Sequence, residues 1–508
     1  MSGESTSATK RDRDRTAPLL LLLAALVGFA WLMQTMASLP FLRGPIFDSA
    51  VYAAQGEAVR AGRFGDPTLL AFSPLYGYVI ALLGGVRSAA TIAIAQLAMW
   101  VTTLWLVHRT VARSEDRASA LLAATLCALH GPLLFYTGKL LAETLGTVLA
   151  IAATSALLSL ETRRGRWSNT IGTGALLALA TLARASQLFA LPLFVASALV
   201  RWGRSDDSSS RVRGKRAAGI ALGIALVLGG NGLWNYSHTG LFVPVILASR
   251  SLQRTTSREW RGRLEDFAPA GADRVSPWDV VDQARARIEA RRRGEREASA
   301  SVGAMLDWRG FFQNIPRKLG GTLQDREITS YMYSYYGEAR ESPLLRWFPV
   351  SFGVLLALGL YGAVRLARRE GLGALAPYAP FFVAGLAACL LYHPSARYRL
   401  PMIYPLLLLA GPALRELVSR ADKGKAHPFI SLATLALVAV FVARHLSYRT
   451  QNPALWNASV ARSHALAGEL PEAAARIAAA RASGPVTADT ERFIQAIPMG
   501  RASSTQAR

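Results

Sequence analysis

The sequence predicts an all-α polytopic membrane protein with about eleven transmembrane helices. Hydrophobic residues make up 52% of the 508 residues and charged residues only 18%, and the mean hydropathy is positive. This composition does not fit a soluble multidomain protein, and it excludes disordered and collagen-like classes. Many apolar runs have about 20 residues, the length that a helix needs to cross a hydrocarbon core about 30 Å thick. We therefore expect a helical bundle within a membrane.

The apolar runs follow one another along most of the chain, and each contains few charges. The first run follows a basic segment, but it is too long for a secretory signal and lacks a cleavage pattern, so we expect a retained anchor. Cys127 and Cys389 lie inside such runs and are interpreted as small buried hydrophobic residues. The predicted spans are roughly 17–39, 88–108, 118–137, 140–160, 169–184, 186–200, 217–236, 345–365, 372–392, 398–415 and 427–446.

The net charge of +24 arises from 57 Lys and Arg residues against 33 Asp and Glu residues. In a soluble protein this excess would indicate nucleic-acid binding. Here the basic residues gather at the N-terminus and in every second connection between spans, which is typical of cytoplasmic loops. We therefore expect a cytoplasmic N-terminal segment 1–16, outer connections at 40–87 and 237–344, an extracytoplasmic C-terminus and no nucleic-acid partner.

Two interrupted apolar segments need a different interpretation. The run Pro74–Gly85 is too short to cross, and a crossing there would break the alternation of basic loops. It is expected to form an interfacial or re-entrant helix. Arg184 interrupts the apolar run 169–200, which predicts two short helices that meet near the outer side, because a midplane arginine would be costly.

Two aspartates in the first outer connection are candidates for chemistry. The residue order after Asp48 predicts a short amphipathic helix on the membrane surface, with Asp48 as its N-cap. The alternative is that Asp48, at the boundary of lipid and water, is the general base for a hydroxyl acceptor. Asp66 precedes Pro67 and is interpreted as a turn former.

Charged residues also occur at the outer ends of later spans. Lys139 and Glu143 are four residues apart, so they would form an i, i+4 ion pair on a helix. A carboxylate at the membrane edge is costly without a purpose, however, so both remain site candidates together with Arg184. His393 stands at a helix end, where a structural role competes with a role as a donor or metal ligand.

Several motifs occur in the order found in one known family. They are Asp48 with Tyr52, Pro74-Leu75-Tyr76, Leu141-Ala142-Glu143 within 132–147, the paired short helices of 174–193, Asn235–Pro244, and Arg397–Pro401 with Pro405. On these motifs, residues 17–446 resemble the GT-C integral-membrane glycosyltransferases. Within these, the chain is similar to the protein O-mannosyltransferase and aminoarabinose-transferase-like group, glycosyltransferase family 39 and the RgtA-B-C-D-like group. Arg397-Tyr398-Arg399-Leu400-Pro401 is the most specific match.

The resemblance implies a GT-C fold and the transfer of a sugar from a polyprenyl-phosphate carrier to a hydroxyl or phosphate acceptor on the outer face of a bacterial-type inner (plasma) membrane. Asp48 is then the expected base of an inverting displacement. Guanidinium groups match phosphate oxygens, so Arg397 and Arg399 are expected to bind the lipid phosphate rather than to reach lipid headgroups. Further donor-site candidates are Tyr398, Lys139, Glu143 and Arg184; acceptor-site or secondary candidates are Tyr52, Asp66, Tyr76 and His393.

No nucleotide-binding, zinc or nucleophile-elbow motif occurs in the sequence. No cofactor is therefore expected with certainty. Some relatives depend on a divalent metal, and the sequence leaves that requirement open for this chain.

The large outer connection and the C-terminal tail complete the predicted organisation. The stretch 280–298 carries mixed charges and predicts a solvated helix. Tyrosines at 331, 333, 335 and 336 either line an acceptor groove or act as interfacial anchors. The tail 447–508 has the spacing of half a tetratricopeptide unit, which must pack on the outer loops or bind a protein partner.

Two other functions compete with a glycosyltransferase. A transporter or flippase of lipid-linked sugars predicts inverted repeats and broken helices that carry midplane charges, and neither pattern is found. A non-catalytic membrane scaffold would present the tail to partners, and Asp48 would then be dispensable.

Overall fold

The computed structural model describes residues 16–160, 166–202, 209–246, 277–295, 307–324, 333–422, 453–483, 486 and 488–499. Within these ranges the regular secondary structure is entirely helical, as the sequence predicts. The first half contains α2 (Thr16–Ser38), α3 (Asp48–Arg60), α4 (Leu75–Leu82), α5 (Ala89–Ser114), α6 (Arg117–Ala128), α7 (Gly131–Phe135), α8 (Glu143–Ser159), α9 (Trp167–Ala183), α10 (Ala190–Leu199) and α11 (Ser210–Thr239).

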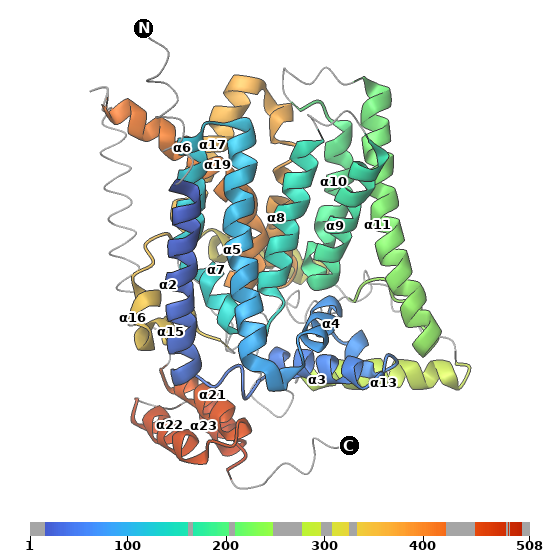
Figure 1. Ribbon diagram of the computed structural model, residues 1–508. Coiled ribbons are helices and arrows are strands. Elements are labelled where there is room, and N and C mark those ends of the chain that lie inside the picture. The colour runs from blue at the N-terminus through green and yellow to red at the C-terminus, as the bar shows by residue number, and fades with distance from the viewer. Residues whose placement is uncertain are drawn as a thin grey trace.

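The second half contains α13 (Pro277–Arg292), α14 (Trp308–Leu323), α15 (Tyr335–Glu341), α16 (Pro343–Arg346), α17 (Phe352–Glu370), α18 (Ala379–Leu391), α19 (Ala396–Asp422), α21 (Pro453–Leu466), α22 (Leu470–Ala482) and α23 (Ala488–Gln495). Short 3-10 helices connect them: η1 (Pro67–Leu70), η2 (Val86–Ser88), η3 (Tyr136–Gly138), η4 (Ala185–Phe189) and η7 (Leu372–Leu375). The long helices form an upright bundle, and α3, α13 and α21–α23 gather at the end opposite the start of α2 (Figure 1).

Four helical segments are long and apolar enough to cross a membrane: Thr16–Ser38, Val86–Ser114, Ser210–Thr239 and Ala396–Arg420. A fifth span results if α6 and the segment Gly131–Gly138, which meet at 56°, are counted together. Other predicted spans correspond to shorter or more charged helices, such as α8, α10 and α18. The count of about eleven spans therefore stays a prediction. The predicted span 427–446 lies outside the described residues.

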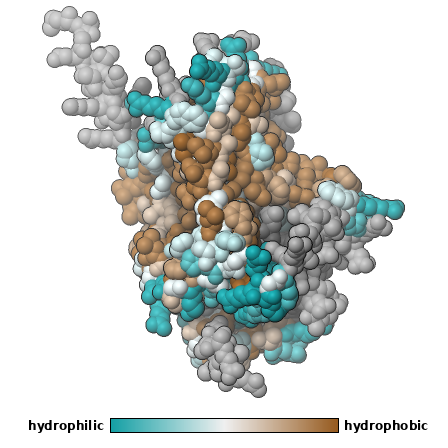
Figure 2. Space-filling model, turned by 90° about the vertical axis from the view of Figure 1, so that its right-hand side faces the viewer, coloured by the Kyte–Doolittle hydropathy of each residue, from teal (hydrophilic) through white to brown (hydrophobic). Residues whose placement is uncertain are grey.

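The surface agrees with a membrane protein. On the face shown in Figure 2, hydrophobic residues form a broad band between hydrophilic surfaces at the two ends. Large apolar side chains stay exposed on α2 and α11, including Leu19 and Leu226, which are 64% and 59% exposed. A soluble monomer rarely exposes so continuous an apolar area, so this band is where the chain meets lipid.

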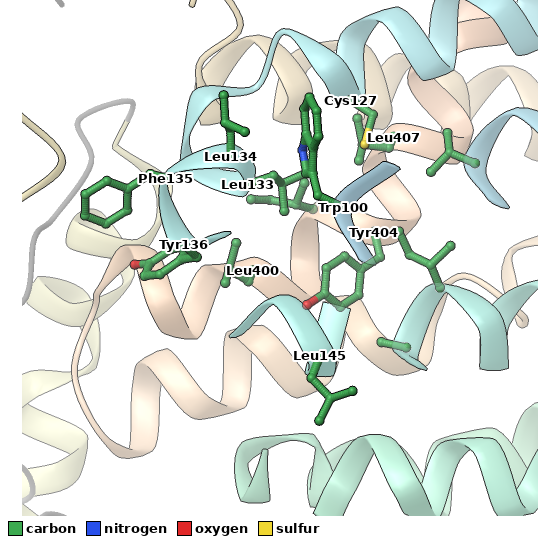
Figure 3. Packing of buried hydrophobic residues seen from close by; sticks show 14 of the residues in the cluster. Trp100, Cys127, Leu133, Leu134, Phe135, Tyr136, Leu145, Leu400, Tyr404 and Leu407 are labelled. Carbon is green, nitrogen blue, oxygen red and sulfur yellow. The ribbon is translucent and has the colours of Figure 1, made fainter. Parts of the chain in front are cut away.

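The core joins helices that are distant in the sequence. Trp100 of α5, Cys127 of α6 and Tyr404 of α19 meet beside the apolar side chains of α7 (Figure 3). Both cysteines are buried and free, as predicted. Tyr404 also joins α19 to α8, since its hydroxyl lies 3.0 Å from Thr147 Oγ1, and these two helices carry Arg397 and Glu143.

The two interrupted segments form a short helix and a broken helix, and their position relative to the membrane stays a prediction. α4 has eight residues and packs on α3, while Arg184 separates α9 from η4 and α10. Glycine permits the close contact of α9 with α11, since a Cβ at Gly174 or Gly223 would clash with the backbone carbonyl of Ile220 or Ile171. The break at Arg184 thus places this arginine at the C-terminal end of α9, which packs tightly on α11.

Candidate active site

Asp48 lies in the first turn of α3, but it does not cap that helix. The N-cap is Phe47, and no side chain caps the helix there. The carboxylate of Asp48 instead accepts a hydrogen bond from Arg397 Nη1, with Oδ2 at 2.7 Å. The prediction of an N-cap role is therefore wrong, because a long-range partner engages this carboxylate. The predicted amphipathic helix itself is confirmed by α3.

Glu143 begins α8 and is the buried partner of two arginines. Its side chain is 1% exposed, and Oε1 accepts a hydrogen bond from Arg397 Nε. Arg184 Nη1 lies 3.6 Å from the same oxygen. The predicted ion pair with Lys139 is wrong, because residues 139–142 precede the helix and do not follow helical geometry.

We call Asp48, Glu143, Arg184 and Arg397 the charged cluster. It contains two carboxylates and two guanidinium groups, so its formal charge is balanced. Arg397 bridges the carboxylates, and the side chains of Asp48 and Arg397 are 16% and 18% exposed. Among the described residues, Glu143 Oε2 and Arg184 Nη1 are buried without a hydrogen-bond partner. Other buried polar atoms of the described residues also lack a partner, but these two belong to charged groups of one cluster, which therefore suits a further polar ligand.

Two tyrosines form an aromatic wall beside the cluster. Tyr52 lies one turn after Asp48 and packs edge to face on Tyr76, with ring centroids 5.3 Å apart. The hydroxyl of Tyr76 donates a hydrogen bond to Gln96 Oε1 at 3.0 Å. Burial, and then the nearby Glu143 carboxylate, raise the pKa of Tyr52 above its usual range. Its hydroxyl therefore stays protonated and can serve as a donor.

Arg399 does not join the charged cluster. Residues two apart on a helix point about 200° apart, so Arg399 faces away from Arg397 on α19. It is fully buried, donates from Nη1 to the carbonyl of Gln324 at 2.7 Å, and lies 4.5 Å above the ring of Phe352. The structure thus places Arg399 between α19 and the end of α14.

Tyr398 and His393 pack together at the start of α19. Tyr398 stacks on Tyr392 with ring centroids 5.3 Å apart, and His393 meets Tyr398 edge to face at 5.1 Å. Burial, followed by the charges of Arg397 and Lys318, lowers the pKa of His393 to about 3. The imidazole is therefore neutral near pH 7.

Lys139 and Asp66 have partners outside the cluster. Lys139 forms a fully buried ion pair with Glu338 of α15. Burial lowers the pKa of Lys139 and raises that of Glu338, and the ion pair opposes both shifts. Asp66 accepts hydrogen bonds from the backbone N and Oγ1 of Thr68, at 2.9 and 2.7 Å. Its predicted role in a turn is confirmed.

The outer-loop tyrosines do not line an open groove. Tyr333, Tyr335 and Tyr336 are all buried, and the prediction of either a groove or interfacial anchors is wrong for them. The hydroxyl of Tyr333 donates to Ser49 Oγ at 2.7 Å, next to Asp48. Tyr331 lies outside the described residues. Sequence reasoning missed Ser49 and Glu338, because their partners are separated from them by 284 and 199 positions.

The side chains present do not assemble a metal site within the ranges that the structure describes. No group of three or more His, Cys, Asp and Glu residues there has the geometry to hold an ion. The two carboxylates of the cluster are both engaged by Arg397.

An all-helical bundle with an apolar band and a partly exposed charged cluster at one end defines a polytopic membrane protein with a polar site. The family model for dolichyl-phosphate-mannose-protein mannosyltransferases matches residues 72–248, about a third of the chain. The matched part contains Tyr76, Glu143 and Arg184 but neither Asp48 nor Arg397. The match confirms the resemblance to GT-C glycosyltransferases over this part.

Among solved structures, the chain is similar to the oligosaccharyltransferase of Archaeoglobus fulgidus. With the form tethered to an acceptor peptide containing the NVT sequon, the TM-score is 0.49 at 13% identity, over 87% of this chain and 55% of that one. With the complex that holds an inhibitory peptide and a dolichol-phosphate, the TM-score is 0.48 at 15% identity, over 88% and 56%. The chain spans about half the length of that protein. A search of curated proteins found no match.

Proposed function

We propose that this protein is a membrane glycosyltransferase that moves a sugar from a polyprenyl-phosphate carrier to a hydroxyl or phosphate acceptor. The observation that carries the proposal is the charged cluster, because its members come from four separate motifs that the family resemblance singles out. The description of the matching family names a lipid-phosphate sugar as donor, which supports this donor class for the present chain. The experiment below identifies the sugar and the acceptor.

Asp48 is the proposed base for a hydroxyl acceptor. Its Oδ2 is held by Arg397, while Oδ1 accepts no hydrogen bond within the described residues. As the acceptor oxygen forms a bond to the anomeric carbon, its proton passes to Asp48. The bond from that carbon to the phosphate oxygen breaks at the same time, and the configuration inverts. A phosphate acceptor would attack without this proton transfer.

The departing lipid phosphate gains negative charge, and guanidinium groups are suited to stabilise it. Arg184 is the best-supported ligand, since its buried Nη1 makes no hydrogen bond within the described residues and lies at the cluster. Arg397 is the second proposed ligand, because it is partly exposed beside Asp48. Arg399 would reach the phosphate only by leaving Gln324, so its predicted role receives less support.

The proposed site faces the extracytoplasmic side of the inner membrane. The first outer connection, α13 and the tail lie at one end of the bundle, together with α3 (Figure 1). The basic connections that predict the cytoplasmic side follow the opposite ends of the spans, as Arg109 and Arg113 do at the end of α5. A lipid carrier anchored in the outer leaflet could therefore present its phosphate to the cluster.

The test uses the purified full-length protein in liposomes with a panel of polyprenyl-phosphate sugars and hydroxyl acceptors. Mass spectrometry should show free polyprenyl phosphate and a glycosylated acceptor in equal amounts. Intact lipid-linked sugar that only changes leaflet would instead identify a transporter. Glycolipid spectra of cells with and without the protein would then identify the natural donor and acceptor.

A further inference from the structure

The residue directly before Asp48 has an unusual backbone conformation. Phe47 has φ 51° and ψ −127°, and it is the one non-glycine residue with positive φ within the described ranges. A side chain with a Cβ is disfavoured there, and such a conformation persists only where surrounding contacts hold it. The direction in which α3 begins, and with it the position of Asp48, depends on those contacts.

Besides the main core, the C-terminal tail contacts the Phe47 side chain, through its described residues 453–483, 486 and 488–499. The ring of Phe493 stacks on that of Phe47, with centroids 5.9 Å apart and planes 9° apart. The guanidinium of Arg462 lies over both rings, 5.6 Å from Phe47 and 5.4 Å from Phe493. A stacked ring pair covered by a cation restricts the ring of Phe47 to one orientation.

The tail also holds the backbone that leads to Phe47. Ser463 Oγ donates to the carbonyl of Gly44 at 2.6 Å, and a Cβ at Gly44 would clash with the carbonyl of Ser463. One step earlier, Arg43 forms an ion pair of 2.9 Å with Glu469. The loop therefore packs directly on the backbone of α21 at Gly44, and Arg43 contacts the residue that precedes α22.

A second route connects the tail to the other side of Asp48. Trp456 Nε1 and Arg476 Nη2 donate to the carboxylate of Glu341 in α15, at 2.7 and 2.6 Å. Just before α15, Tyr333 donates to Ser49 Oγ and to the carbonyl of Ile46. The tail thus contacts Phe47 directly and reaches Ser49 through α15, so the residues on both sides of Asp48 depend on it.

We propose that the tail is a positioning element for Asp48, with Arg462 and Phe493 as positioning residues that act through Phe47. This inference rests on the proposed role of Asp48 as the base. Without these contacts, Phe47 relaxes to negative φ, the first turn of α3 frays, and Asp48 moves away from Arg397. The tail is then a part of the catalytic unit, and its packing on the outer loops serves to hold Asp48 in position.

Hydrogen exchange tests the contact independently of activity. In Arg462→Ala and Phe493→Leu, amides of residues 45–55 should exchange about tenfold faster than in the wild type, because the local opening becomes easier. Leucine at 493 keeps the apolar packing among Ala458, Ala480 and Ile494. The matched control is Arg481→Ala, which removes an exposed pair with Glu491 inside the tail and should leave these amides unchanged.

The kinetic readout uses the same variants in the transfer assay. The expected result is a kcat about tenfold lower with an unchanged KM for the lipid donor, since the donor contacts stay in place. Phe493→Leu should have no further effect in a Phe47→Gly background, because the ring through which Phe493 acts is absent.

Unchanged exchange at residues 45–55 in both tail variants would overturn the inference, and so would additive losses of kcat with Phe47→Gly. If the tail variants exchange faster at residues 45–55 but the wild-type protein transfers no sugar, the proposed function alone would be overturned. In that case the mechanical link between the tail and α3 would still stand.

Discussion

The buried ion pair between Lys139 and Glu338 allows a quantitative prediction of stability. Both side chains are fully buried, and Lys139 Nζ also lies 4.6 Å from the ring centroid of Phe135. Lys139→Met fills the same space but leaves the Glu338 carboxylate buried without its cation. Removing one partner of such a pair costs about 3–5 kcal/mol, which corresponds to a change of about 10² to 10³ or more in the folding equilibrium.

The double variant Lys139→Met, Glu338→Leu shows whether the lost stability comes from the unpaired Glu338 charge or from altered packing. With both charges removed, stability should return to within about 1.5 kcal/mol of the wild type, since apolar replacements of buried pairs are often neutral. The matched control is Arg285→Met, which breaks an exposed pair with Asp282 and should cost less than about 1 kcal/mol. SDS-induced unfolding in mixed micelles, followed by the fluorescence of the 11 tryptophans, measures all three variants.

The pH dependence of Lys139→Met has a definite sign. Burial raises the pKa of Glu338 above the ordinary value of 4.5, so the folded state favours the protonated carboxyl. The stability of the variant is then highest below about pH 4.5 and falls as the pH rises. A single variant as stable as the wild type at pH 7, or a double variant as unstable as the single one, would refute this reasoning.

Three further predictions concern the site. Arg397→Lys removes the guanidinium fork that holds Asp48 and Glu143 together, so kcat in a transfer assay should fall by about 10² to 10³. Size-exclusion chromatography should show that the variant still folds. Arg184→Gln should raise the Kd for polyprenyl phosphate about tenfold if Arg184 binds the phosphate, and an unchanged Kd in a binding titration would contradict that role. Because the pKa of His393 is about 3 in the folded chain and 6.5 ordinarily, the wild type should lose stability as pH falls from 6.5, whereas His393→Gln should show a flatter acid profile in thermal melts.

Local patterns predicted much of the fold correctly. α3 follows from its residue order, α4 from the length of its apolar run, and the break between α9 and α10 from the cost of burying Arg184 in a bilayer. These features depend on neighbouring residues and on the general thickness of a membrane, so a single sequence is enough to predict them. The role of Asp66 followed equally from the proline next to it.

The partners of the charged side chains could not be predicted in this way. The sequence placed Lys139 beside Glu143, but the chain between them is not helical, and each found a partner in a distant segment. Arg397 and Arg399 looked equivalent in their motif, yet only the direction of α19 decides that Arg397 meets Asp48. Such choices are made by the packing of whole helices, for which spacing in the sequence gives no rule.

The tail shows the same limit. Its helix pair was predicted from the spacing of small residues, and the alternatives were packing on the outer loops or binding a partner. The structure shows that the tail packs on the outer loops, because it contacts Gly44 and Phe47. These contacts join residues more than 400 positions apart in the sequence.

Asp48→Asn, compared with Asp66→Asn, tests the central claim most directly. Both variants remove one carboxylate from the first outer connection, but only Asp48 belongs to the charged cluster. With a polyprenyl-phosphate sugar and a hydroxyl acceptor, Asp48→Asn should abolish transfer at unchanged expression, while Asp66→Asn should keep most of the wild-type rate. Undiminished transfer by Asp48→Asn would contradict its role as the base and, with it, the assignment of the site.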